Sequence, residues 1–301
     1  MDVQQKLQTL DYDTIIAELV DQFIRYGYES RGYPKSTMKT RATHLRQFVT
    51  YCNAKGILGI NNLSLLFIDT YFAEYQQTHK KSTTNTSRRI LKVFLRWVGE
   101  YKEVVVRVQP EAIRLVKEPD PLPQTIDHEV IKKVVMECQN KQDALMIATL
   151  YEGGLRISEL VGLDVMDING DAIHVRGKGE IDRIVYITDR LAYKLMKHCE
   201  GKYPHEAVFE HDYCNAGGRL SIGVARNHIQ HSFMSLVNMR MHPHQLRHSF
   251  AFNLLKTGCD LVTIQRLLGH KDITTTQRYL RLTDDYLRST YKTHMGQSII
   301  A

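Results

Sequence analysis

The amino-acid sequence predicts a mainly α-helical protein of two domains, with a small antiparallel β-sheet in the second. Three observations support this fold class. Apolar residues recur at helical spacing through the first 107 residues, where no strand pattern occurs. Two glycine-containing turns separate short apolar runs near residues 165–187. Between these regions, one short stretch holds four of the seven prolines, namely Pro110, Pro119, Pro121 and Pro123.

Four amphipathic stripes predict a small helical bundle at residues 1–107. Each stripe spaces its apolar residues so that they share one helix face. Because the first stripe begins close to the N-terminus, we expect no further folded domain before it. The stripes span Ile15 to Ile24, Leu45 to Cys52, Ile68 to Tyr75 and Ile90 to Val98.

The proline-rich stretch predicts a linker at residues 108–123. Proline locks φ and disfavours helix in the residue before it, so Glu118 to Gln124 should be extended. We therefore expect a second domain over residues 124–301.

This second domain should surround a β-rich insert with helices. Helical patterns cover residues 125–139 and 142–151. A hairpin is expected from strands at 165–168 and 172–175, because Asn169-Gly170 supplies the positive φ values of a tight turn. A second turn at 177–180 leads to a third strand at 183–187.

Composition excludes several classes of protein. With 43% hydrophobic residues among 301, the chain can bury a core, which excludes wholesale disorder. The five cysteines form no C-x-x-C pair, which disfavours zinc ribbons and disulfide frameworks and favours a reducing, cytosolic setting. No signal region opens the chain and no apolar run approaches ~20 residues, so we expect no membrane association. A net charge of +7 favours a polyanionic partner.

The densest cluster of reactive side chains lies within His242–His248. His244 and His248 have the spacing of a zinc-binding helix, but Gln245 stands where that chemistry needs a glutamate base. His244 and Arg247 share one helix face, and an arginine fork beside an imidazole suits a phosphate. The alternative is a helix end with solvated side chains.

Four further residues could belong to the same site. Arg156 follows a Gly-Gly pair at a helix start, and Lys178 lies at the tip of a glycine-flanked turn. His270 ends a helix, and Tyr279 comes shortly after it. Each alone also fits a structural role as a solvated helix residue, a turn lysine, a helix cap or a core tyrosine.

In this order the residues resemble the tyrosine recombinase (phage integrase) family, whose pattern is Arg, a hairpin Lys, His-x-x-Arg, His and Tyr. The match is near-verbatim at His244–Ala251, Leu267–His270 and Thr275–Tyr279. The resemblance covers nearly the whole chain and is closest to compact Xer-type recombinases, because we expect no room for the arm-binding domain of lambda-type integrases. It implies a four-helix core-binding (SAM-like) domain at 1–107 and a catalytic domain at 124–301.

The resemblance implies a DNA strand transferase with a covalent 3′-phosphotyrosyl intermediate. Tyr279 would be the nucleophile, and Arg156 and Arg247 would hold the non-bridging phosphate oxygens. Lys178 would protonate the departing 5′-oxygen, and His244 would act as general acid and base toward the tyrosine.

His270 would donate a hydrogen bond to the phosphate, and Glu159 would orient neighbouring groups. The sequence offers no paired carboxylates, no metal-ligand set and no Walker-type loop, so we expect no metal, cofactor or ATP.

Basic residues on the second and fourth helices are candidates for DNA binding, although a solvated charged face is the alternative. The candidate contact residues are Lys39, Arg41, His44, Lys81, Thr83, Thr84, Asn85, Arg88 and Arg89. The expected partner is double-stranded DNA with an inverted-repeat core site. The resemblance implies a tetramer on two duplexes and a Holliday junction, with or without accessory proteins.

The tail at about 282–301 is amphipathic and is expected to dock on a neighbouring protomer, although it could also fold onto its own domain. The protein should act in the cytoplasm, at the nucleoid of a prokaryote or on a mobile element. Two rivals are a type IB topoisomerase and a catalytically silent DNA-binding relative. Chromosome or plasmid dimer resolution, cointegrate resolution and mobile-element integration all stay open.

Overall fold

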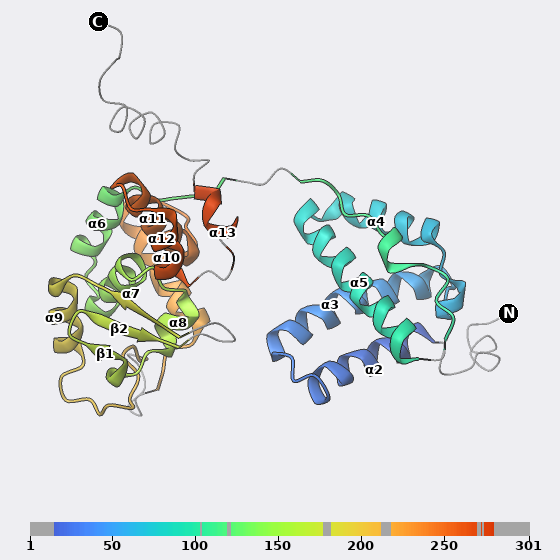
Figure 1. Ribbon diagram of the computed structural model, residues 1–301, viewed down its shortest axis with the longest axis horizontal. Coiled ribbons are helices and arrows are strands. Elements are labelled where there is room, and N and C mark those ends of the chain that lie inside the picture. The colour runs from blue at the N-terminus through green and yellow to red at the C-terminus, as the bar shows by residue number, and fades with distance from the viewer. Residues whose placement is uncertain are drawn as a thin grey trace, which may run out of the picture. The chain divides into compact units, whose positions relative to one another are not determined.

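A computed structural model describes residues 15–102, 104–118, 122–176, 182–211, 218–269, 272 and 274–279. The chain divides into two compact units, residues 1–120 and 121–301 (Figure 1). This division falls inside the proline-rich range 108–123. Within the described residues, none of the helices combines the length and apolar character that a membrane crossing requires.

The N-terminal unit is a bundle of four helices whose buried faces are the four apolar stripes. Phe23, Phe94 and Trp97 form the aromatic centre of its core, with ring centroids 5.7 Å apart for Phe23 and Phe94 and 5.4 Å apart for Phe23 and Trp97. The helical expectation for this region is thus confirmed. The helices are α2 (Ile16–Glu29), α3 (Lys35–Ala54), α4 (Leu65–Thr78) and α5 (Lys81–Tyr101), with a 3₁₀ turn η2 (Ile60–Asn62) before α4.

Much of the expected linker packs against the N-terminal unit. A 3₁₀ turn, η3 (Pro110–Ala112), lies against α5, and Val108 and Ile113 are buried in the N-terminal core. The side chain of Asn85 donates to the carbonyl of Val116 and accepts from its N–H, both at 2.8 Å. Residues 108–118 are therefore part of this unit, because the apolar side chains on either side of Pro110, Val108 and Ile113, fit its core.

The C-terminal unit is helical around one small sheet. Strands β1 (Ile168–Asn169), β2 (Ala172–Val175) and β3 (Arg183–Tyr186) pair antiparallel in that order. Gly170 has a φ of +60°, as expected, but Asn169 does not have a positive φ: it pairs with Ala172 at the end of β1, so the two-residue turn consists of Gly170 and Asp171. The helices are α6 (His128–Glu137), α7 (Lys141–Glu152), α8 (Ile157–Gly162), α9 (Asp189–His198), α10 (Ile222–Val237), α11 (Pro243–Lys256), α12 (Leu261–Leu268) and α13 (Thr274–Gln277).

One sequence expectation for the sheet differs from the structure. The run at 165–168 forms a 3₁₀ turn, η4 (Val165–Asp167), and β1 begins only at Ile168. The backbone N–H of Asp164 donates to the carboxylate of Asp167 at 2.9 Å. This local hydrogen bond stabilises a turn in place of the strand.

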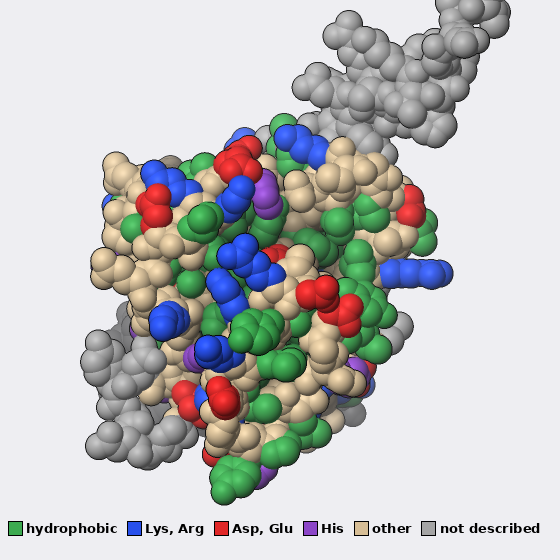
Figure 2. Space-filling view, turned by 90° about the vertical axis from the view of Figure 1, so that its left-hand side faces the viewer, with side chains coloured by type: hydrophobic (Ala, Val, Ile, Leu, Met, Phe, Trp, Pro, Cys, Tyr) green, Lys and Arg blue, Asp and Glu red, His purple; other side chains and the backbone are tan. Residues whose placement is uncertain are grey.

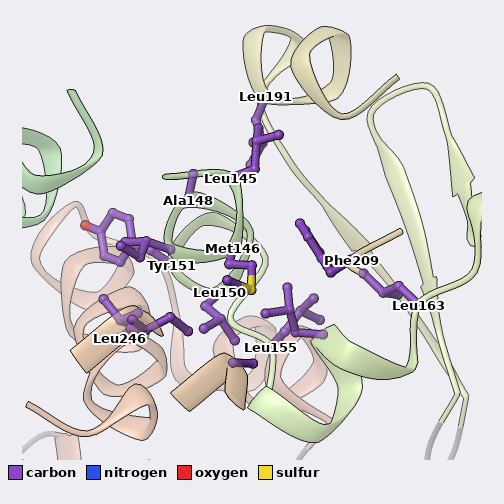
Figure 3. Packing of buried hydrophobic residues seen from close by; sticks show 14 of the residues in the cluster. Leu145, Met146, Ala148, Leu150, Tyr151, Leu155, Leu163, Leu191, Phe209 and Leu246 are labelled. Atoms are coloured by element: carbon purple, nitrogen blue, oxygen red, sulfur yellow. The ribbon is translucent and has the colours of Figure 1, made fainter. Parts of the chain in front are cut away.

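Helix α7 lies at the centre of the C-terminal unit, in contact with α6, α8, α9, α10 and α11. Met146 and Leu150 project from it into the space between Phe209 and Leu246, and Leu145 lies beside Leu191 (Figure 3). A smaller apolar cluster joins α11 and α12 to the segment after α13. Its members are Ala251, Leu255, Ile264, Leu268 and Tyr279.

Candidate active site

Arg156 is positioned by the start of α8. The chain reaches this helix through Gly153 and Gly154, and Arg156 is its N-cap residue. The backbone N–H of Arg156 donates to Glu159 Oε2, and its guanidinium donates to Glu159 Oε1, both at 2.8 Å. Glu159 therefore holds both the backbone and the side chain of Arg156.

Glu159 also holds a second arginine, which the sequence analysis did not identify. The guanidinium of Arg183 on β3 donates to both carboxylate oxygens of Glu159, at 3.0 and 2.8 Å. Both side chains are only 7% exposed. Burial opposes the charge on Glu159, but hydrogen bonds and charge from Arg183 and Arg156 outweigh it and lower its pKa to about 2.

Arg183 joins three segments of the C-terminal unit. Its Nε donates to the carbonyl of Leu267 at 3.0 Å, near the end of α12. Gly269 ends that helix with a φ of +65°, and a Cβ there would lie 2.9 Å from the Arg183 side chain. Strand alternation could have revealed this arginine, because Arg183 and Val185 both face inward.

Arg247 lies at the centre of the site and is 1% exposed. Its guanidinium donates to the carbonyl of Gly154 at 2.7 Å and to the carbonyl of Leu268, and lies 3.8 Å from Glu159. Burial, followed by the charge of Arg156, lowers its pKa to about 10, so it stays cationic at neutral pH. Among the described residues its Nε has no hydrogen-bond partner, so this buried donor faces no acceptor.

Close packing around Gly154 supports this arrangement. Its φ is +58°, and a Cβ would approach the ring of Phe250 to 2.5 Å. Glycine is therefore required where the backbone turns to present its carbonyl to Arg247.

Two histidines on α11, the helix of Arg247, contact one another, and the second of them contacts Tyr279. The rings of His244 and His248 meet edge to face, with centroids 4.5 Å apart. His248 Nδ1 lies 2.7 Å from the hydroxyl of Tyr279, which is 2% exposed. The sequence alone suggests His248 only as a zinc ligand and does not predict its contact with Tyr279, although both residues lie inside the segments that resemble the family.

Burial determines the charge states of Tyr279, His248 and His244. Burial raises the pKa of Tyr279 to about 12. Burial, and next the neighbouring His244, lower the pKa of His248 to about 4. Partial desolvation, Arg247 and Arg156 also lower the pKa of His244, whose ring still reaches solvent. At neutral pH the tyrosine and both imidazoles are therefore uncharged.

The structure brings four of the six expected catalytic residues into one connected cluster, while Lys178 and His270 lie outside the described residues. Together with His248, these four make two cations, two neutral imidazoles and a phenol, which can bind a phosphate diester and present a nucleophile to it. In the described parts of the chain, no group of His, Cys, Asp or Glu is arranged to hold a metal ion. The four residues are Arg156, His244, Arg247 and Tyr279.

The candidate DNA-binding residues of the N-terminal unit fall into three groups: exposed, buried and half-buried. Lys39 on α3 and Lys81 and Arg89 on α5 are exposed. Thr84 and Asn85 are buried, and Asn85 is engaged by Val116 and by the side chain of Glu118.

The other four candidates are half-buried. Arg41 lies over the ring of Tyr33 at 4.7 Å, and His44 approaches the hydroxyl of Tyr75. Arg88 is 11% exposed, lies over Phe72 and donates to the carbonyl of Arg114. Thr83 is the fourth. In the C-terminal unit, Figure 2 shows a face on which Lys and Arg side chains gather near the middle.

Comparison with known proteins identifies the class. The pattern of the phage integrase family matches residues 124–285, so the chain belongs to this family. It is 30% identical over 294 residues to the tyrosine recombinase XerC of Listeria monocytogenes serovar 1/2a, covering 92% of this chain and 97% of that protein. Identity to the tyrosine recombinase XerA of Pyrococcus horikoshii is 28% over 281 residues, covering 92% and 93%.

Solved structures share the fold. A XerH recombinase bound to a palindromic difH substrate has a TM-score of 0.72 at 19% identity, covering 92% of this chain and 84% of that one. A lambda integrase dimer bound to a COC′ core site has a TM-score of 0.70 at 16% identity, covering 89% and 78%. The fold expected from the sequence is confirmed. The protein is an Xer-like site-specific tyrosine recombinase, an enzyme that cuts and rejoins DNA.

Proposed function

We propose that Tyr279 is the nucleophile of this recombinase. Its oxygen would form a bond to the scissile phosphorus as the bond to the 5′-oxygen breaks, leaving a 3′-phosphotyrosyl link and a free 5′-hydroxyl. Rejoining is the reverse reaction and needs no ATP. The observation that carries this proposal is the contact of the Tyr279 hydroxyl with His248, the chain neighbour of the buried Arg247.

Arg156 and Arg247 would stabilise the charge that develops on the non-bridging oxygens. Glu159 lies within 3.8 Å of both guanidinium groups, which keeps two like charges close together. An arginine has about five N–H donors, and among the described residues carbonyl groups accept two of those of Arg247, so others are available to a phosphate.

Three residues complete the proposed mechanism. Lys178, which comes between β2 and β3 in the sequence, would protonate the departing 5′-oxygen. His270 follows Gly269 and would donate a hydrogen bond to the phosphate. The sequence predicts His244 as general acid and base toward the tyrosine, but the side chain that contacts the Tyr279 hydroxyl is His248, so the exposed His244 is proposed to act at the phosphate instead.

For the DNA, the exposed Lys39, Lys81 and Arg89 would supply phosphate contacts, because exposed cations release counterions on binding. The target would be an inverted-repeat core site, recombined through a Holliday junction by a tetramer on two duplexes. Its setting would be the nucleoid of a prokaryotic cytoplasm or a mobile element. The same chemistry could resolve dimers, resolve cointegrates or integrate a mobile element, and these three roles are alternatives for this protein.

The test of the nucleophile compares two buried tyrosines. Tyr279→Phe should abolish covalent cleavage of a nicked half-site, since loss of a nucleophile costs roughly 10⁶-fold in well-studied enzymes. It should leave DNA affinity unchanged. Tyr151→Phe is the matched control, because its buried hydroxyl also contacts a histidine, His128, at 2.9 Å.

That control should cleave normally. A phosphotyrosyl peptide containing Tyr286 or Tyr291 in place of Tyr279 would contradict the assignment.

The proposed assembly has a separate test. Deleting residues 286–301 should leave binding to a single half-site intact, because the exposed cations of α3 and α5 are untouched. Cooperative filling of two half-sites and strand exchange between duplexes should be lost. Gel-shift titration on one-site and two-site DNA measures both quantities, and unchanged cooperativity would show that the tail does not join protomers.

A further inference from the structure

His248 is the side chain that contacts the hydroxyl of Tyr279. The two residues are 31 positions apart, and the 2.7 Å separation between Nδ1 and Oη is that of a good hydrogen bond. We infer that His248 accepts the phenolic proton as Tyr279 attacks the DNA and returns it during religation. This inference rests on the proposed role of Tyr279 and assigns a further catalytic residue to the reaction.

The direction of the hydrogen bond follows from the charge states. The phenol is protonated and the His248 imidazole is neutral at pH 7, since their pKa values are about 12 and about 4. A phenol has one proton to donate, and a neutral imidazole has one nitrogen that accepts. With Nδ1 as the acceptor, the ring proton of His248 is on Nε2.

The surroundings explain why this proton transfer waits for DNA. Among the described residues, the charged or titratable groups that act on His248 are His244 and Arg247 on α11 together with Arg278 and Tyr279 after α13. The two arginines disfavour a cationic imidazole. A bound phosphate diester beside them offsets their charge and raises the pKa of His248, while bonding to phosphorus acidifies the phenol.

Position separates the work of the two histidines. His244 is one turn earlier on α11 and is exposed, and among the described residues it makes no hydrogen bond to the Tyr279 hydroxyl, whereas His248 does. His248 lies between His244 and Tyr279. The Tyr279 ring packs in the cluster of α11 and α12, so the helix that carries His248 also holds the nucleophile.

The proton balance of the step is complete. The Tyr279 oxygen bonds to phosphorus, its proton passes to His248 Nδ1, and the bond from phosphorus to the 5′-oxygen breaks. The 5′-oxygen receives its proton from the general acid on the other side of the phosphate. Religation reverses each transfer, with His248 returning its proton to the phenolate.

Two substitutions distinguish a residue that accepts the proton from one that only holds the Tyr279 hydroxyl in place by a hydrogen bond. His248→Ala removes both functions, whereas His248→Asn keeps an oxygen that accepts a hydrogen bond but cannot take the proton at neutral pH. Single-turnover cleavage should fall by about 10²–10⁴-fold in both variants. Wild-type cleavage in His248→Asn, or unchanged or faster cleavage in His248→Ala, would overturn the inference.

A religation substrate separates loss of proton transfer from damage to the fold. An oligonucleotide whose 3′-phosphate carries p-nitrophenol mimics the covalent intermediate, and nitrophenolate leaves without a proton. His248→Ala should join this substrate to a 5′-hydroxyl strand at close to the wild-type rate. An equally large loss in this reaction would overturn the inference, because it would place the defect at the phosphate.

Tyr279→Phe, run in parallel, keeps the inference distinct from the proposed function. If Tyr279→Phe still forms a covalent adduct, the proposed nucleophile is wrong. If Tyr279→Phe forms no adduct while His248→Ala cleaves at the wild-type rate, the nucleophile stands and only the role of His248 is wrong.

Discussion

The two units of this recombinase bury polar side chains for different purposes. In the N-terminal unit, Asn85 and Arg88 on α5 bond to the backbone of Val116 and Arg114, so they tie down one segment next to their own helix. In the C-terminal unit, Glu159 pairs with arginines from other elements. A buried polar group that bonds to the backbone of one neighbouring segment stabilises the fold. A buried charged group that bonds to arginines from several elements indicates a functional site.

The electrostatic reason lies in the cost of burying charge. A buried carboxylate is tolerated only when hydrogen bonds and opposite charge replace its lost hydration. Glu159 meets this condition through Arg156 and Arg183, with Arg247 nearby, so removing any partner disturbs the others. The proposed catalytic residues are therefore coupled to the stability of the unit.

The largest expected effect separates the proposed acid from the proposed phosphate ligand. Lys178→Ala should slow cleavage by about 10²–10⁴-fold, because the 5′-oxygen leaves without a proton. A substrate with a 5′-bridging sulfur has a leaving group that needs no proton, so it should restore cleavage. It should not restore Arg247→Ala, whose loss of a charge-stabilising donor costs about 10²–10³-fold.

Single-turnover cleavage of oxygen and sulfur substrates measures this difference, with DNA affinity and thermal melting as controls for folding. Equal rescue of both variants, or of neither, would show that the acid and the phosphate ligand have been misassigned.

Glu159→Gln should destabilise the C-terminal unit by about 3–5 kcal/mol, because Arg183 and Arg247 lose their buried counter-charge. The exposed Glu111, paired with Arg96 at 2.8 Å, provides the control. Glu111→Gln should melt close to the wild type, since exposed ion pairs contribute little. Denaturant unfolding of the three proteins measures the difference, and equal stability of both variants would contradict the coupling.

Acid unfolding gives a second measure of the same carboxylate. Folding lowers the pKa of Glu159 from 4.5 to about 2, so its contribution is full above pH 4.5 and is lost as the pH falls through about 2. The loss should amount to about 3 kcal/mol. The difference in unfolding free energy between wild type and Glu159→Gln should shrink over this range, and a constant difference would contradict the ion pairing.

The smallest effects separate scaffold from surface within α5. Asn85→Ala should destabilise the N-terminal unit by about 1–3 kcal/mol, because the backbone groups of Val116 lose their partner. Lys81→Ala and Arg89→Ala should leave stability unchanged. Each should make the slope of the logarithm of the binding constant against the logarithm of the salt concentration shallower by about one. A change of base preference in folded Asn85→Ala would instead place Asn85 at the DNA.

The sequence by itself determined the helices, the Asn-Gly hairpin and the family, because apolar periodicity, turn chemistry and motif order are local properties of the chain. Tertiary structure decided which side chains meet. Arg183 reaches Glu159 across 24 positions and Leu267 across 84, and no local pattern encodes either contact. Likewise, the sequence shows that the helix at 81–101 is rich in basic residues. Only the packing shows that Asn85 and Arg88 are turned toward the protein interior while Lys81 is exposed to solvent. Residues far apart in the sequence meet because the hydrophobic cores pack in one particular way, so these contacts cannot be derived from spacing along the chain.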